Sequence, residues 1–226
     1  MAKIRDNQER ARMAQIWIKI SMGVYVATIP YILYAIDITT RGGYPTQQEI
    51  AIFGLASVVM VIVGLGTFIG SAVTFIQWFR RSYYNLHQLT GGLSYTEGWA
   101  AGAWFVPIFN LFGPYQIAKE IVMKSEKLLG NDPFDKKPSN LLQTIGLWWG
   151  FWIASGVINR LDIVMRDNPN LELYFSLIAS ALGIIAGIFV LKFIKSYSEI
   201  EIKLRNLDPD ETAPIIDGSD LLDSTL

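Results

Sequence analysis

The sequence predicts an all-α integral membrane protein, a four-helix bundle with a re-entrant or interfacial broken segment and an amphipathic helix on the cytoplasmic side. Charged residues make up only 17% of the chain, against about 25% in soluble domains. Four apolar runs are each long enough to cross a bilayer as a helix. They cover about 16–36, 50–79, 141–158 and 171–193. Between the second and third runs lies 98–116, an apolar segment broken by glycine and proline.

The first two spans are separated by a short polar connection. Asp37 follows the apolar run 16–36 and is expected to end the first helix. Thr46 and Glu49 have the spacing of a capping box, in which each side chain accepts a hydrogen bond from a backbone N–H of the first turn. This pattern predicts that the second helix begins near Gln47.

The second span, 50–79, has no charged residue and no helix breaker follows it until Gly91, so its helix should continue into the aqueous phase. The next part of the chain, about 94–129, is expected to form an interfacial cap on the cytoplasmic side of the bundle. A second capping box is expected there between Ser94 and Glu97. The stretch 114–129 has an amphipathic helical pattern and should stop at Gly130. Its apolar stripe comprises Ile117, Ala118, Ile121, Val122, Ser125, Leu128 and Leu129.

The positive-inside rule predicts the orientation. With four spans, one side of the membrane carries sixteen Lys and Arg, and the other carries only Arg41, Arg160 and Arg166. Both termini are therefore expected in the cytoplasm, and the broken segment belongs to the same side. The predicted parts are a cytoplasmic N-terminal segment (1–15), a membrane domain (16–205) and an acidic tail (206–226), either disordered or a docking peptide.

Each span contains small residues four positions apart, a spacing that lets helix backbones approach closely in lipid. The pairs are Gly23 and Ala27, Gly66 and Gly70, Gly146 and Gly150, and Gly183 and Gly187. We favour packing within one bundle over a dimer interface as the reason for these pairs.

Catalytic chemistry has few candidates. The chain has no cysteine and one histidine, His87, which excludes thiolate and His-pair metal sites. No ionisable group lies at mid-membrane depth, which argues against a charge-relay pump. Glu97 and Glu120 form a conceivable carboxylate pair, although Glu97 has the capping explanation given above. We expect no enzyme activity, no cofactor, no metal and no nucleic-acid partner.

Candidate functional or interface residues surround the broken segment. Trp78, Arg81 and Asn85 share one helical face. In the structural interpretation, Trp78 is an interface anchor, Arg81 a snorkelling or phosphate-binding cation and Asn85 a partner for irregular backbone nearby. In the functional interpretation, they form a site that faces the broken segment. In the broken segment, Asn110 is a candidate because its amide could satisfy carbonyls freed at Pro107. The other candidates there are Trp99, Trp104, Pro114 and Tyr115. Lipid headgroups would be bound by Arg80, Arg81, Lys119, Lys124 and Lys127.

Two stretches also carry a family resemblance. The segment 75–85 contains a Trp, an Arg and an Asn at a fixed spacing, namely Trp78, Arg81 and Asn85. A longer core follows, which consists of Gly98, Trp99, Trp104, Phe105, Val106, Pro107, Asn110, Leu111, Pro114 and Tyr115. With Gly146-Leu-Trp-Trp149, this core resembles the bacterial membrane proteins grouped as domain-of-unknown-function family 4328. The resemblance implies a membrane topology and a bacterial cytoplasmic (inner) membrane, and it assigns no activity.

The leading functional hypothesis is a scaffold or accessory subunit that acts through protein–protein contacts. Its expected partners are the lipid bilayer and either another protein or further copies of the chain in a homo-oligomer. Two alternatives stay open. One is an oligomeric channel or transporter for an uncharged solute, with the broken segment lining its path. The other is an anionic-lipid-binding membrane protein.

Overall fold

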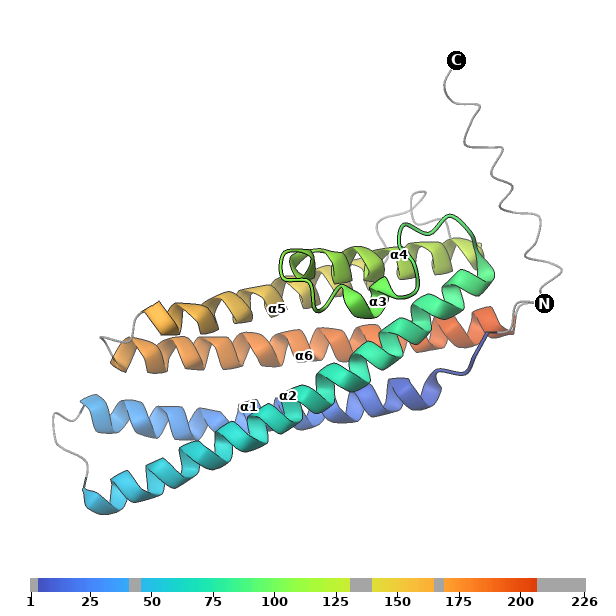
Figure 1. Cartoon of the computed structure of the whole chain (residues 1–226). Coiled ribbons are helices and arrows are strands. Elements are labelled where there is room, and N and C mark those ends of the chain that lie inside the picture. Colours follow the sequence, from blue (N-terminus) through green and yellow to red (C-terminus); the bar gives the residue numbers. More distant parts are fainter. Residues whose placement is uncertain (1–3, 41–45, 131–139, 165–168, 207–226) are drawn as a thin grey trace. The chain divides into compact units, whose positions relative to one another are not determined.

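The structure is a computed structural model and describes residues 4–40, 46–130, 140–164 and 169–206. This described part is helical and contains no strand. Figure 1 shows the long helices and the short elements that come between α2 and α5 in chain order. The elements are α1 (Gln8–Thr40), α2 (Gln47–Leu89), α3 (Trp99–Gly102), the 3-10 helix η1 (Phe109–Leu111), α4 (Gly113–Leu128), α5 (Asn140–Val164) and α6 (Pro169–Arg205).

The protein is a multi-pass membrane protein. Each of the four long helices is long and apolar enough to cross a membrane, which confirms the predicted fold class. Helix α2 has 43 residues and is about 64 Å long at 1.5 Å per residue, roughly twice the hydrocarbon thickness of a bilayer. After Glu49 in the first turn of α2 the next charged residue is Arg80, and after Glu172 in the first turn of α6 the next one is Lys192. The later parts of both helices, which carry Arg81 and Glu201, therefore lie outside the membrane-spanning segments.

Local sequence patterns account for most helix ends. Thr46 and Glu49 form the predicted capping box, because the Thr46 N–H donates to Glu49 Oε2 at 2.8 Å and the Glu49 N–H donates to Thr46 Oγ1 at 3.2 Å. The expectation that Asp37 ends the first helix is wrong, since α1 continues to Thr40. The hydroxyl of Thr40 donates to the carbonyl of Ile36 at 2.9 Å and so bonds back onto the last turn.

The predicted amphipathic helix is α4, which begins one residue earlier than expected, at Gly113. Five residues of the predicted stripe, Ile117, Ala118, Ile121, Val122 and Ser125, are buried. Gly130 stops the helix as predicted, with a φ of 75° that suits glycine. Residues 131–139 and the predicted acidic tail, apart from Asn206, lie outside the described residues.

The chain divides into two compact units. Unit 1 comprises Met1–Ala11, Ile76–Gln143 and Ile194–Leu226, and unit 2 comprises Arg12–Phe75 and Thr144–Phe193. Unit 2 holds the apolar spans, whereas unit 1 holds the broken segment, α4 and the polar ends of α2 and α6.

Small residues of unit 2 pack against larger side chains of the same chain. The Trp17 ring of α1 fills the space beside Gly70, and Met22 fills the space beside Gly187. A Cβ atom at Gly183 would lie 3.3 Å from the ring of Tyr25. Gly23, Gly66 and Gly150, which also belong to the predicted pairs, have nothing within 4 Å where a Cβ would stand. Three of the predicted small residues thus serve packing within the chain, as the bundle interpretation expects.

The outward face of α2 in unit 2 is apolar. Leu55 and Val61 are both 68% exposed and Ile62 is 65% exposed. In water such a surface would favour aggregation, whereas in a bilayer it contacts acyl chains at no comparable cost.

Unit 1 has a core of its own, built around aromatic side chains. Trp78, Phe79 and Tyr83 of α2 are fully buried. The Trp78 ring lies edge-on to Tyr197 of α6, with centroids 6.2 Å apart. The Ser125 hydroxyl of α4 lies 3.2 Å from the Tyr197 hydroxyl. These contacts join α2, α4 and α6 in one packed unit.

Candidate functional site

A buried amide lies at the centre of a polar cluster in unit 1. Asn7 precedes α1 and is only 2% exposed. Its Nδ2 donates to the Trp78 carbonyl at 3.2 Å, to Ser82 Oγ at 3.0 Å and to Glu201 Oε2 at 3.2 Å. The segment before α1 is thereby bonded to both α2 and α6.

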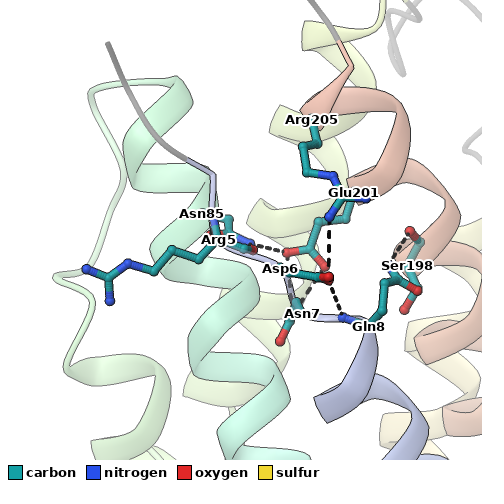
Figure 2. Close-up of polar contacts among 8 residues, drawn as sticks. All are labelled: Arg5, Asp6, Asn7, Gln8, Asn85, Ser198, Glu201 and Arg205. Carbon is teal, nitrogen blue, oxygen red and sulfur yellow. Dashed lines mark hydrogen bonds and ion pairs between the residues drawn. The ribbon is translucent and has the colours of Figure 1, made fainter.

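Glu201 supplies a buried carboxylate to this cluster, and it is 5% exposed. Asn85 Nδ2 donates to its Oε1 at 2.6 Å (Figure 2). Among the described residues, no Lys or Arg nitrogen lies within the 4.0 Å of an ion pair with this carboxylate. Burial therefore raises the pKa of Glu201, while the hydrogen bonds from Asn85 and Asn7 offset part of the rise.

Asn85 also fixes the backbone of Arg5. Its Oδ1 accepts the Arg5 N–H at 3.0 Å, and its Nδ2 donates to the Arg5 carbonyl at 2.8 Å. One buried side chain thus pairs both backbone groups of a residue 80 positions away. Such pairing holds an irregular segment in a single backbone conformation, because unpaired buried backbone groups are energetically costly.

Two further contacts hold the start of α1. Asp6 Oδ1 accepts the Gln8 N–H at 2.9 Å, as an N-cap does. This hydrogen bond lowers the pKa of Asp6, burial opposes the shift, and the nearby charge of Arg205 adds to the lowering. Arg205 Nη1 lies 3.5 Å from Asp6 Oδ1 in an exposed ion pair. The Gln8 side chain donates to the Ser198 carbonyl at 3.3 Å.

A second polar cluster links the loop after α2 to α4. Glu120 Oε1 accepts from both the N–H and the hydroxyl of Ser94, at 2.8 and 2.9 Å, and its Oε2 accepts the Tyr83 hydroxyl at 2.7 Å. The expected capping box of Ser94 with Glu97 is therefore wrong. Glu97 instead pairs with Arg80 at 3.1 Å. The physical reason is that α3 begins only at Trp99, so Ser94 has no helix to cap.

The two carboxylates that could have formed a pair are thus occupied separately, Glu97 by an arginine and Glu120 by hydroxyl and amide donors. Among the described residues, no group of three or more His, Cys, Asp or Glu is placed to hold a metal ion. The described polar groups of unit 1 chiefly hold segments together.

The broken segment folds as two short helical turns with an exposed apolar edge. Phe105 and Ile108 are each 76% exposed, and Leu111 is 54% exposed. The Phe109 ring lies edge-on to three other rings, those of Tyr95, Trp99 and Phe112, at centroid distances of 5.6, 5.0 and 5.0 Å. This aromatic cluster fixes the shape of the segment.

The expectation that the Asn110 side chain satisfies carbonyls freed at Pro107 is wrong. The backbone N–H of Asn110 donates to the Val106 carbonyl at 2.7 Å, so the turn after Pro107 is closed by the main chain. Its side-chain Oδ1 is buried and has no hydrogen-bond partner among the described residues.

The structure brings some predicted site residues together and separates others. Trp78 and Asn85 belong to the Asn7 cluster, and Trp78 is core rather than an interfacial anchor because it is fully buried. Trp104 packs edge-on against Phe79 at 6.2 Å. The remaining candidates lie apart from the Asn7 cluster: Trp99 and Pro107 are exposed, Pro114 is buried in the first turn of α4, and Tyr115 is half-buried.

The predicted headgroup-binding residues do not form one group. Arg80 is engaged by Glu97. Lys119 and Lys127 are exposed on α4, and Lys124 on the same helix is half-buried. Arg81 is half-buried and its guanidinium carbon lies 5.4 Å from the centroid of the Tyr84 ring. Binding of lipid headgroups by these residues stays a prediction.

Sequence reasoning did not identify Asn7 or Glu201. A usable pattern was present for Glu201, because Ile194, Tyr197 and Leu204 form an apolar stripe on α6 and a carboxylate falls on it. A charge on an apolar stripe predicts a buried partner. No comparable local pattern marks Asn7.

The comparisons with known proteins identify a family. The family model described as "Domain of unknown function (DUF4328)" matches residues 42–199. The comparisons with curated proteins and with solved structures gave no match.

Proposed function

The chain belongs to the DUF4328 family, whose description assigns no activity, and we therefore propose from the chain's own geometry that it is a non-catalytic scaffold or accessory subunit. On this proposal unit 1 binds a partner membrane protein through residues 105–112, the docking segment. The observation that carries the proposal is an apolar edge presented by a segment of fixed shape.

The docking segment offers only apolar chemistry to a partner. No charged side chain occurs anywhere in 98–116. Phe105 and Ile108 are the most exposed large hydrophobic residues of the described chain, at 76% each. A complementary partner surface would be an apolar helix, since a polar one would lose hydrogen bonds to water without gaining any here.

Packing against neighbouring aromatic side chains fixes the shape of the docking segment. The Phe109 ring contacts three aromatic rings, and it occupies the space where a Cβ of Gly113 would stand. Trp104 packs on the buried Phe79. A surface that is already ordered loses little conformational entropy on binding, which favours association.

Lipid anchoring alone explains this shape less well than a protein partner does. Four membrane-spanning helices already hold the chain in the bilayer, and one spanning helix is effectively irreversible. A further lipid anchor would add little retention and would need no ordered aromatic cluster. Protein interfaces, in contrast, are enriched in aromatic side chains at their centres.

Photo-cross-linking in native membranes tests the proposal. A photoreactive amino acid replaces Ile108 in the docking segment or, as a matched control, Ile62 on the lipid-facing side of α2, which is 65% exposed. The scaffold role predicts a discrete protein adduct at position 108, with the same partner in replicate membranes, and lipid adducts only at position 62. Lipid adducts alone at both positions would reject it.

Flux measurements separate this proposal from the channel alternative. Liposomes that contain the purified chain should show no more leakage of small uncharged solutes than empty liposomes do. A flux that rises with protein content and changes in Pro107→Ala would favour a channel instead.

A further inference from the structure

Two arginines of unit 1 share one aromatic ring. The guanidinium carbon of Arg5 lies 4.6 Å from the centroid of the Tyr84 ring, and that of Arg81 lies 5.4 Å from the same centroid. Both distances are within the range of cation–π contacts. The two positive charges are therefore held within about one Debye length, about 10 Å at 0.1 M salt, where they repel each other.

A third arginine adds to this charge. Arg10 lies in the first turn of α1, where a positive side chain opposes the helix dipole. The pKa of Arg81 is lowered, chiefly by partial burial and next by the charges of Arg10 and Arg5, whereas smaller contributions from Tyr84 and Glu97 raise it. Arg5 and Arg81 thus share the Tyr84 ring, and Arg10 in the first turn of α1 is near enough for its charge to act on Arg81.

Counter-charge for these arginines is lacking in the part of the chain that the structure describes. None of the three guanidinium groups has a carboxylate within the 4.0 Å of an ion pair there. The Glu97 carboxylate that attracts Arg81 weakly is bound to Arg80.

A hydrogen-bond network fixes the position of Arg5. Asn85 pairs with both backbone groups of Arg5, at 3.0 and 2.8 Å, and is itself held by the buried Glu201. Figure 2 shows that the Arg5 guanidinium points away from the Glu201 carboxylate. A buried network thus presents Arg5 beside Tyr84, where Arg81 also lies.

We propose that Arg5, Arg10 and Arg81, the arginine cluster, bind a phosphate group, with Tyr84 holding two of the guanidinium groups in place. Guanidinium forks bind phosphate oxygens in pairs, so converging arginines favour this anion. In sequence the three arginines flank the first two apolar spans, 16–36 and 50–79, at the level where anionic headgroups attract basic residues. This site is independent of the docking segment.

Native mass spectrometry of the full chain tests the site. The protein is extracted from membranes with equal amounts of phosphatidylglycerol and phosphatidylcholine, and retained lipids are counted. Preferential retention of phosphatidylglycerol is expected. Arg5→Gln, Arg10→Gln and Arg81→Gln should each weaken it about fivefold, equivalent to about 1 kcal/mol per basic residue at a membrane surface. Arg12→Gln, which alters an exposed arginine of the same helix, should leave it unchanged.

Substitutions of Tyr84 test whether the cluster is a shaped site or only a region of charge. Tyr84→Phe should retain the preference, whereas Tyr84→Leu, which keeps every charge, should weaken it two- to fivefold through loss of the cation–π contacts. An equal loss in Arg12→Gln and in the cluster variants would overturn the proposal. So would a wild-type chain with no preference for phosphatidylglycerol and no binding of inorganic phosphate.

Excess inorganic phosphate distinguishes the sources of the ligand. Displacement of the retained phosphatidylglycerol would assign the site to a soluble phosphate, and resistance would assign it to a lipid headgroup; both outcomes support phosphate chemistry. Deletion of residues 207–226 tests the acidic tail as an internal competitor. If anion binding appears only in that deletion, the tail is the partner of the arginines and the proposal fails.

Discussion

Replacement of Asn85 by alanine should release the N-terminal segment from unit 1. Asn85 donates to the buried carboxylate of Glu201 at 2.6 Å and pairs with both backbone groups of Arg5. A hydrogen bond to a charged group contributes about 1.5–3 kcal/mol and a neutral one about 1 kcal/mol, so the variant should lose about 3–5 kcal/mol locally. The loss exceeds that of an ordinary surface substitution because the buried carboxylate keeps its desolvation penalty.

Hydrogen–deuterium exchange measures this loss in the protein as it exists in detergent or nanodiscs. The Arg5 amide donates to Asn85 Oδ1, so it should be protected in the wild type. A loss of about 3 kcal/mol corresponds to roughly a hundredfold faster exchange or more in Asn85→Ala. Asn159→Ala, at an exposed asparagine of α5, serves as the control. Equal exchange of the N-terminal peptide in both variants and the wild type would refute the reasoning.

Three more predictions follow from the same packing. The free energy of unfolding of unit 1 should fall as the pH rises from 4.5, the ordinary pKa of Glu201, through the raised pKa of this group in the fold, because the fold disfavours the charged form. Glu201→Gln should flatten this pH dependence in pH-jump exchange experiments. Tyr83→Phe removes a hydroxyl that bonds a carboxylate of α4 and should cost about 1–3 kcal/mol, seen as faster exchange in residues 93–99. Gly70→Ala should overlap the Trp17 ring and cost about 1–3 kcal/mol in detergent unfolding, whereas Gly66→Ala should be neutral or stabilising; equal effects would contradict the packing.

The elements that sequence patterns predicted well are those set by neighbours along the chain. The four spans follow from runs of apolar residues, and Thr46 with Glu49 forms a capping box because both partners lie within one turn. The buried stripe of α4 follows from the period of its apolar residues, and Gly130 stops that helix through its own backbone conformation.

The elements that were missed depend on contacts between distant positions. Asn7 reaches Glu201 across 194 positions, and Ser94 finds Glu120 rather than the Glu97 that stands three residues away. A capping pattern carries no information on whether a helix follows at the right residue, and here α3 begins too late. Only Glu201 left a trace in the sequence, as a carboxylate on an apolar stripe.

Part of the predicted site was right in location and different in role. Trp78 and Asn85 do share one cluster, as their helical spacing indicated, but Trp78 is buried core rather than an interface anchor. Asn85 does bond to irregular backbone, that of Arg5. Arg81 belongs to the same helical face but turns to the Tyr84 ring. The spacing on a helix predicts which residues share a face, whereas the partner of that face depends on the rest of the chain.

The most direct test of the scaffold proposal is the yield of the protein adduct at position 108 in the wild type and in Gly113→Ala. This substitution leaves every exposed side chain of the docking segment unchanged but places a Cβ where the Phe109 ring lies. If the docking segment binds a partner through its fixed shape, the adduct should fall at least severalfold while lipid adducts at position 62 stay constant. An undiminished adduct would contradict the account, because apolar contact alone would then be sufficient.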